Sequence, residues 1–294
     1  MALKSLFDTL KKGGYIVKDL DLYLMNLSNT DSDRAINVNA PSQISNCMRA
    51  NFYLRKGYEK DPNCVDARAR RIFDNGTHVH LRLQEYLKEE GILLMDEVPL
   101  RENTYKIQGH TDGLLKLSDK EIGILEIKSI NDRSFSALID AKEEHKEQAM
   151  TYIFCAENRR KYLKSTYKNF LAFKKSEKER KEYYRQLFDY MKDGHKYTRE
   201  EKINNQVSLG IQADNILYKT KTPITKVIFL YENKNSQELK EFTVEYDEAI
   251  MNSILERCKT LNEMVENDEL PEREGTNKNT PPCKWCDYKI ECFN

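Results

Sequence analysis

The segment from Gly109 to Lys128 constrains the fold of this chain more than any other, because it predicts a β-hairpin. Residues 113–117 alternate apolar and polar side chains, which is the period of a strand with one buried face. Residues 118–120, Ser-Asp-Lys, supply turn chemistry, and residues 122–127 form a second run rich in β-branched side chains. We therefore expect two antiparallel strands joined by a short turn.

Two carboxylates lie on this predicted hairpin. Asp112 is where the first strand begins and Glu126 is near the end of the second, so antiparallel pairing brings them to one end of the hairpin. Lys128 follows Glu126 by two residues and points to the same face, because side chains alternate along a strand. Two oxygen ligands beside an ammonium predict a Mg²⁺ or Mn²⁺ site that acts on phosphate. The competing interpretation is two solvated strand ends, and the rest of the chain must decide between them.

The composition of the chain limits the classes of protein to which it can belong. Its 294 residues are enough for one large domain or for a domain with an insertion. The 48 basic residues balance 48 acidic ones, so nucleic-acid binding would need a local patch rather than a global field. The N-terminus alternates charged and apolar residues, and no apolar run is long enough to span a membrane. We expect no signal peptide, no membrane contact and a cytoplasmic location.

The seven cysteines are unevenly distributed, and three of them lie near the C-terminus. An odd number in a chain expected in the cytoplasm argues against a disulfide framework. Cys283 and Cys286 form a C-x₂-C pair, and Cys292 follows. A tetrahedral thiolate site needs a fourth ligand, for which Cys47 is the candidate and Cys64, Cys155 and Cys258 are the alternatives. The opposing interpretation is a group of reduced cysteines that binds no metal.

The first part of the chain is expected to be helical. Residues 1–30 carry an amphipathic pattern, so we assign residues 1–40 to an N-terminal helical segment that packs on the rest or binds a partner; the pattern is marked by Leu6, Leu10, Leu20, Leu22 and Leu24. Pro41-Ser42 then predicts the start of another helix, with Ser42 as its cap and Cys47 inside it.

A further helix is predicted around two histidines. Its apolar side includes Ile72, Val79, Leu83 and Leu87. His78 and His80 are two apart on this helix and cannot share one ligand face, so at most one of them reaches a metal. A lone helical histidine is more often structural than a ligand unless a metal site is independently expected.

Beyond the hairpin, a helix carries Gln148 and Tyr152, which are four apart and share one helical face. They are either an exposed amide and a rim aromatic or, in a nuclease, contacts to a DNA strand and to a water near the metal. Strands are then predicted at residues 226–231 and 240–246, followed by a helix from Asp247 to Asn267.

Residues 159–224 are interpreted as a helical insertion between core elements. From Arg159 to Arg185 the chain has eleven Lys or Arg and three acidic residues, interleaved with aromatic side chains. We interpret this stretch as a DNA-holding arm. Its basic side chains would release counterions from the DNA phosphates, and its aromatic rings would stack on unpaired nucleobases. The basic residues on which this interpretation depends include Lys174, Lys175, Lys178, Arg180 and Lys181. A solvated helical pair or a docking surface for a protein partner is the alternative.

The ordered set of motifs resembles the iron-sulfur branch of the PD-(D/E)XK nucleases, the RecB-like exonucleases that include CRISPR-adaptation nucleases, AddB-type nuclease domains and phage homologues. The order runs through Cys47, Gly76-x-x-x-His80, Asp112, Glu126-Ile127-Lys128, Gln148-x-x-x-Tyr152 and the tail cysteines Cys283, Cys286 and Cys292. Thr111 stands where the family name has proline. The resemblance covers most of the chain outside residues 1–40 and the basic insertion, so residues 41–294 are assigned to one nuclease domain whose tail, residues 281–294, closes on Cys47.

The resemblance implies an α/β fold in which a central mixed sheet is flanked by helices. It implies that the catalytic metal, Mg²⁺ or Mn²⁺, is bound by His80, Asp112, Glu126 and the backbone carbonyl of Ile127, that Lys128 orients or activates water, and that Gln148 and Tyr152 contact substrate. It further implies a [4Fe-4S] cluster on Cys47, Cys283, Cys286 and Cys292.

The activity that the resemblance implies is metal-dependent exonucleolysis of DNA ends, most of all of single strands, in recombination, repair or CRISPR adaptation, with DNA and a protein of that process as partners. The alternative is a DNA-binding or adaptor subunit that keeps the fold and cluster without cutting, which the intact His-Asp-Glu-Lys set disfavours. A zinc-stabilised binding module would share the tail but would give no role to the hairpin acids.

Overall fold

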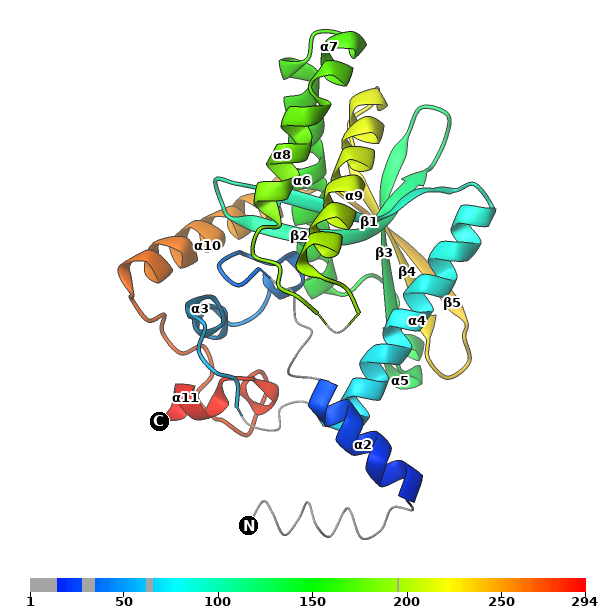
Figure 1. The fold of residues 1–294 in the computed structure, drawn as a ribbon. Helices are drawn as coiled ribbons and strands as arrows, with labels where there is room; N and C mark the ends of the chain where they lie inside the picture. The colour runs from blue at the N-terminus through cyan, green and yellow to red at the C-terminus, as the bar shows by residue number, and fades with distance from the viewer. Residues whose placement is uncertain (1–14, 28–34, 62–65, 195) are drawn as a thin grey trace.

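A five-stranded mixed β-sheet forms the centre of the structure, a computed structural model that describes residues 15–27, 35–61, 66–194 and 196–294 (Figure 1). Its strands lie across the sheet in chain order: β1 (Leu93–Glu102), β2 (Ile107–Lys116), β3 (Ile122–Ile130), β4 (Lys226–Asn233) and β5 (Leu239–Glu245). All neighbours are antiparallel except β3 and β4, which are parallel. A parallel pair needs a long crossover connection, and residues 131–225 supply it.

Helices surround this sheet on both faces. They are α2 (Tyr15–Leu27), η1 (Pro41–Gln43), α3 (Met48–Lys56), α4 (Ala67–Glu89), α5 (Asp132–Ser136), α6 (Glu143–Thr166), α7 (Phe170–Lys175), α8 (Glu177–Leu187), α9 (Arg199–Lys219), α10 (Glu248–Asn267), η2 (Cys283–Trp285) and α11 (Lys289–Phe293). The expected architecture, a central mixed sheet flanked by helices, is therefore confirmed. Among the described residues, no helix combines the length and apolar character that crossing a bilayer requires.

The two faces of the sheet bury different apolar clusters. On one face, Val79 and Leu83 of α4 pack with Leu125 and Ile127 of β3. On the other, α6, α9 and α10 pack against the strands in the larger cluster, to which β3 supplies Ile124. Because successive side chains of a strand alternate between faces, Glu126 and Lys128 lie on the face that α6 covers.

Several predicted elements are confirmed. The hairpin pairs from Gly113 with Leu125 to Lys116 with Ile122. The two later strands are β4 and β5, which pair along their whole length. The helix α10 follows Asp247, whose carboxylate accepts hydrogen bonds from the N–H groups of Ala249 and Ile250 and so caps it.

The helix predicted to begin at Pro41-Ser42 and to contain Cys47 was wrong. Residues 41–43 form only a 3₁₀ turn without a side-chain cap, and Cys47 is the extended N-cap residue of the separate helix α3. The reason is a long-range contact, since the N–H of Met48 donates to the Glu274 carboxylate at 2.8 Å. A local capping pattern cannot reveal a partner more than two hundred positions away.

Two predicted apolar faces were wrong in part. Val79 and Leu83 are buried and Leu87 packs beside them, but Ile72 is exposed in the first turns of α4. In the N-terminal segment Leu24 is buried, whereas Leu20 and Leu22 are exposed; Leu6 and Leu10 lie outside the described residues. Among the described elements, α2 makes its main contact with α4, and Ile16, Val17, Leu20 and Leu22 of α2 are exposed.

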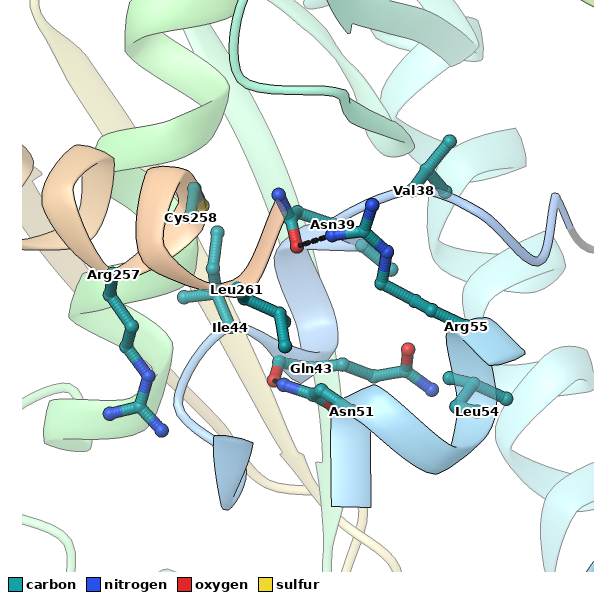
Figure 2. Close-up of a pocket in the computed structure, with 11 residues that line it drawn as sticks. Val38, Asn39, Gln43, Ile44, Asn51, Leu54, Arg55, Arg257, Cys258 and Leu261 are labelled. Carbon is teal, nitrogen blue, oxygen red and sulfur yellow. Dashed lines mark hydrogen bonds between the residues drawn. The ribbon is translucent and has the colours of Figure 1, made fainter. Parts of the chain in front are cut away.

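A buried arginine joins the segment before η1 to α3 and α10 (Figure 2). The Arg55 guanidinium donates to the side-chain oxygens of Asn262 at 2.6 Å, of Asn39 at 3.1 Å and of Asn37 at 2.8 Å. Burial without a carboxylate partner lowers the pKa of Arg55 from its ordinary value. Three amide oxygens thus solvate a buried cation, and they fix α3 against the rest of the domain.

The basic stretch is helical, but part of it is structural. Residue 159 lies inside α6, and α7, α8 and α9 follow it. Arg159 and Arg180 both bind the buried Asp214 carboxylate, at 2.8 Å and 3.3 Å. Phe173 and Tyr184 are buried as well. The interpretation of Arg180 and of these aromatic rings as DNA contacts was therefore wrong, because they form the interior of the helical layer.

Candidate active site

The strands β2 and β3 separate at the point where the predicted acids lie. Their pairing ends with Gly113 opposite Leu125. Beyond it, β2 continues beside β1 alone and β3 continues beside β4 alone. Asp112 and Glu126 are the next residues on either side of this opening, so the backbone itself holds the two carboxylates apart.

Close packing of backbone at the opening requires glycine. A Cβ atom on Gly113 would collide with a side-chain carbon of Leu93 and would lie 2.7 Å from the carbonyl oxygen of Met95. On the neighbouring residue, the Thr111 hydroxyl donates to the Leu125 carbonyl at 2.7 Å. These contacts fix the position of β2 directly before Asp112, and threonine at position 111 supplies a link that proline could not.

The Asp112 carboxylate connects α4 to β3. One oxygen lies 3.0 Å from His80 Nδ1, and the other accepts the backbone N–H of Ile127 at 2.5 Å. Burial alone lowers the pKa of His80, but the hydrogen bond and the charge of Asp112 outweigh it, so the pKa of His80 is raised. His78 is exposed on α4, as expected if only one of the two histidines points toward the acids.

The Glu126 carboxylate is held by α6 and by its own strand. Its Oε1 accepts hydrogen bonds from Lys128 Nζ at 2.7 Å and from Gln148 Nε2 at 3.0 Å. Lys128 Nζ also donates to Gln148 Oε1 at 2.9 Å, and Gln148 Nε2 lies 2.6 Å from the Tyr152 hydroxyl. Of the two residues predicted to contact substrate, Gln148 therefore contacts the predicted acid and lysine directly, and Tyr152 is joined to them through Gln148; both side chains are buried.

Burial has a strong effect on Glu126. Desolvation, followed by the charge of Asp112, raises the pKa of Glu126 to about 7. Its second oxygen, Oε2, is buried and has no hydrogen-bond partner. An unpartnered buried carboxylate oxygen is costly, and a cation at this position would offset that cost. Glu126, Asp112 and His80 together form a donor set of the kind that hard divalent cations prefer.

Two further residues belong to this centre although the sequence analysis did not single them out. Gln84, one helical turn after His80, donates to the Asp112 carbonyl at 2.8 Å and to Glu97 Oε1 at 3.2 Å. Desolvation and the nearby charge of Asp112 raise the pKa of Glu97. Glu97 has φ +48°, a strained conformation for a residue with a side chain, and such strain is typical of functional positions. The i, i+4 spacing from His80 could have indicated Gln84; nothing local indicated Glu97.

The four cysteines of the predicted cluster line one cavity between α3 and the C-terminal tail. Cys47 precedes α3, Cys283 and Cys286 flank η2, and Cys292 lies in α11. The lining is almost wholly apolar apart from Arg273 and Lys289 at its edge. A Cβ atom on Gly275 would collide with the Cys283 sulfur, so a glycine is needed beside this thiol.

The other described cysteines lie elsewhere. Cys155 and Cys258 belong to the main core, where burial raises the pKa of Cys258 to about 12 and that of Cys155 still further. Burial and the neighbouring sulfurs, Cys47 and Cys292 among them, also raise the pKa of Cys283 and of Cys286. Cys64 lies outside the described residues. Of the three alternatives to Cys47, two are thus remote from the tail cavity.

Neither centre is a closed ligand set by itself. Within the described part of the chain, no three His, Cys, Asp or Glu side chains are grouped closely enough to hold a metal ion without adjustment. In the acid centre, Lys128 and the Ile127 N–H occupy carboxylate oxygens that a cation would share.

Comparison with known proteins gives similarity only to solved structures. No family model matches the sequence, and no curated protein sequence matches it. The chain is similar to an alkaline exonuclease, LHK-Exo, from Laribacter hongkongensis, with 13% identity, a TM-score of 0.44, and coverage of 80% of this chain and 90% of that one. It is also similar to SSO0001, with 17% identity, a TM-score of 0.45, and coverage of 95% and 96%. LHK-Exo in complex with dAMP gives 12% identity, a TM-score of 0.40, and coverage of 80% and 90%. At these levels, the function must be inferred from the side chains described above.

Proposed function

We propose that the protein is a metal-dependent DNA nuclease of the PD-(D/E)XK type that removes nucleotides from DNA ends. The observation that carries this proposal is the convergence of Asp112, Glu126 and His80 at the opening between β2 and β3, where Glu126 Oε2 is buried and unpartnered. Structural carboxylates seldom keep one oxygen in that condition, because an unsatisfied buried acceptor is costly.

In this proposal Asp112, Glu126, His80 and the Ile127 carbonyl hold Mg²⁺ or Mn²⁺. The bound ion supplies Lewis-acid stabilisation of charge on the scissile phosphate. The chain's own residues prepare the site: the Ile127 N–H fixes one oxygen of Asp112, and Gln148 with Lys128 fixes one oxygen of Glu126. Glu126 Oε2 is left without a hydrogen-bond partner and is available to a cation.

Lys128 is the residue that we propose acts on the attacking water. An ammonium has three N–H donors, and two of those of Lys128 are directed at Glu126 and Gln148. The third can donate to the oxygen of the attacking water and so orient it. As the new P–O bond forms, the P–O bond to the sugar oxygen breaks, and the proton that the water loses passes through solvent to the departing sugar oxygen. The same charge stabilises the phosphorane-like transition state. Gln148 and Tyr152 then contact the strand that is being cut.

The exonuclease assignment and the biological setting depend on the order of motifs in the sequence. On that basis we propose action on DNA ends, with preference for single strands, in recombination, repair or CRISPR adaptation beside a protein partner of that process. A non-cutting adaptor would retain the fold and the cysteines, but it would have no need of a lysine held between a buried acid and an amide.

We also propose a [4Fe-4S] cluster on Cys47, Cys283, Cys286 and Cys292. Four sulfurs around one apolar cavity, with Arg273 and Lys289 at its edge, fit a group that is ligated by thiolates and carries net negative charge. When bound, the cluster would hold the tail to α3. Zinc ligated by the same cysteines is the alternative, and metal analysis of anaerobically purified protein separates the two.

The nuclease proposal is tested on end-labelled DNA with Mg²⁺ or Mn²⁺, with chelator, and with Asp112→Asn protein. We expect progressive release of labelled nucleotides by the wild type and none with chelator or with the variant. If wild-type protein that contains its cluster leaves the DNA intact with both Mg²⁺ and Mn²⁺, the result would favour the non-cutting adaptor.

A further inference from the structure

A large hollow lies beside the proposed active site, on residues 108–110 of β2 and on Tyr152. Its volume is about 1350 Å³, which exceeds the roughly 300–1,000 Å³ of typical small-molecule pockets. The floor includes residues 108–110 of β2 and Tyr152 of α6, and Tyr152 is hydrogen-bonded to the amide that holds Glu126. The hollow is thus connected to the acid centre through Tyr152 and Gln148 and through β2, which runs from the hollow to Asp112. Its size suits a polymer rather than a single small ligand.

Two walls enclose this hollow. One comprises residues 35–43, the end of α3 with Tyr58 and Lys60, and Tyr288 of the tail. The other comprises the connection from α8 to α9 and the first turns of α9, with Tyr190, Tyr197 and Gln206. The His110 ring links floor and wall, since it lies 2.8 Å from Gln206 Oε1 and is stacked on Phe188 with 6.0 Å between the ring centres.

The chemistry of the lining points to an unpaired nucleic-acid strand. Five tyrosines line it: Tyr58, Tyr152, Tyr190, Tyr197 and Tyr288. Tyr197 is 61% exposed and Tyr58 is 41% exposed, so their rings are open to stacking from the hollow. Amide side chains such as Gln43, Gln108 and Asn205 add donors and acceptors for base edges.

The charge of the lining is basic but modest. The bases are Lys60, Arg70 and Lys202, and the one acid is Glu201. The Glu201 carboxylate accepts hydrogen bonds from the Thr198 N–H and hydroxyl in a capping box, so it serves α9. Lys60 and Arg70 also contact Asp287 and Asp74. Such a surface lacks the two rows of cations that would follow both backbones of a duplex.

We infer that this hollow, which we call the tyrosine groove, binds a short single-stranded DNA segment and guides its end to Glu126. The inference rests on the proposed nuclease function and adds where and how the substrate is recognised. The inferred DNA contact lies in residues 190–206 of the connection between β3 and β4, because these residues line the hollow and none of residues 159–187 does. The contact is therefore not made by Lys174, Lys175, Lys178 and Lys181. Recognition by stacking implies weak dependence on sequence, and a lining with three bases implies a shallower salt dependence than a wholly basic groove would show.

Binding is tested apart from cutting, in Asp112→Asn protein with chelator, by fluorescence anisotropy of a labelled oligothymidine of about 12 nucleotides, within the site sizes of stacking grooves. We expect Tyr197→Ala and Tyr58→Ala each to weaken binding about tenfold, since stacking on one aromatic contributes about 1–3 kcal/mol. Tyr197→Phe should bind as the parent does, because it keeps the ring. Tyr86→Ala, an equally exposed tyrosine of α4 outside the groove, is the matched control.

The outcomes separate the groove from the nuclease. The groove is supported if single strands bind at least tenfold more tightly than blunt duplex and the two groove variants alone are weakened; that result stands even if the wild type never cuts DNA. It is overturned if Tyr197→Ala and Tyr58→Ala bind like Tyr86→Ala, or if duplex binds as tightly as single strand, even where cleavage with Mg²⁺ is observed. A steep salt dependence that disappears in Lys174→Ala/Lys175→Ala protein would likewise overturn it and return the contact to α7.

Discussion

The acid centre and the cysteine cavity are two candidate metal sites in one chain, and they are held together in different ways. In the acid centre, Asp112, Glu126 and Lys128 come from one hairpin, and hydrogen bonds of 2.5–3.0 Å already fix them. In the cavity, Cys47 and Cys292 come from opposite ends of the domain, and apolar side chains surround the sulfurs. The acid centre is pre-organised by the protein, whereas the cavity depends on whatever the sulfurs bind.

This difference predicts opposite responses to loss of the metal. Removal of a divalent cation from the acid centre leaves the hydrogen bonds of Gln148 and Lys128 in place, so the fold persists. Removal of the cluster leaves four thiols in an apolar cavity, and α3 and the tail are then joined only by hydrogen bonds such as Lys60 to Asp287 and by apolar contacts such as Tyr53 with Tyr288. Metal binding that joins distant segments contributes directly to folding. The acid centre should therefore govern activity, and the cavity should govern stability.

The largest effect is expected at Lys128. Lys128→Ala removes the donor to the attacking water and the charge near the phosphate, so we expect the cleavage rate to fall by at least about 10²–10³-fold. Because DNA affinity comes from contacts elsewhere, binding in chelator should change less than about twofold, and the melting temperature should stay close to that of the wild type. Single-turnover cleavage, anisotropy and thermal unfolding measure the three quantities. Activity retained in Lys128→Ala and also in Glu126→Gln would move the active site.

The second largest effect is expected at Cys47, in the cysteine cavity. Cys47→Ala should abolish the visible absorption of anaerobically purified protein and lower its stability by several kcal/mol, since it opens the bridge between α3 and the tail. Cys258→Ala, in the main core, should keep iron and colour even if it loses some stability by leaving a small cavity. Colourless wild-type protein with stoichiometric zinc would replace the cluster by zinc. Bleaching by Cys64→Ala, with Cys47→Ala still brown, would reassign the fourth ligand.

The acid centre could be predicted from the sequence because its geometry is local. The period of a strand placed Glu126 and Lys128 on one face, the turn placed Asp112 opposite them, and helical spacing grouped Gln148 with Tyr152. The partners that come from distant segments could not be found in this way. Glu97 joins the centre through a strained backbone on β1, and Glu274 displaces the expected start of a helix from Pro41 to Met48.

The basic insertion shows the limit of composition as evidence. Its positive charge predicted a DNA contact. Instead, Arg159 of α6 and Arg180 of α8 both bind the buried Asp214 of α9, and these ion pairs join the three helices. Charge counted along the chain does not distinguish a buried ion pair from an exposed patch. The tyrosines that do line the groove are spread over four segments, and no local pattern connects them.

Arg55 lies between the two centres, and its replacement tests whether they are independent. Arg55→Met leaves the oxygens of Asn262, Asn39 and Asn37 without their donor, so we expect a loss of about 2–3 kcal/mol, the usual contribution of hydrogen bonds to a charged group. Urea unfolding measures it. If the centres are separate, cleavage by folded protein and iron content per folded chain should not change. A parallel loss of activity would show that α3 also positions the acid centre.

The smallest predicted effect concerns pH and reaches the acid centre through Lys128. His145 Nδ1 lies 2.6 Å from the Tyr231 hydroxyl, and burial, followed by the charge of Lys128, lowers the pKa of His145 to about 3. In the unfolded chain an ordinary histidine titrates near pH 6.5, so the unfolded state binds the proton first as pH falls. The contribution of neutral His145 to the free energy of unfolding is therefore complete above about pH 6.5, and it is lost as the pH falls from there to about 3. The loss is at most about 1.4 kcal/mol per pH unit. It is smaller than this limit because the ring is half-exposed and solvent screens its charge.

His145→Gln isolates this effect, because the amide can still bond to the Tyr231 hydroxyl but does not titrate. Unfolding free energies measured in urea at about pH 7 and about pH 5 should differ less in His145→Gln than in the wild type. The exposed His78→Gln is the matched control and should retain the wild-type pH dependence. An unchanged pH dependence in His145→Gln would mean that a group other than His145 causes the loss of stability between those pH values.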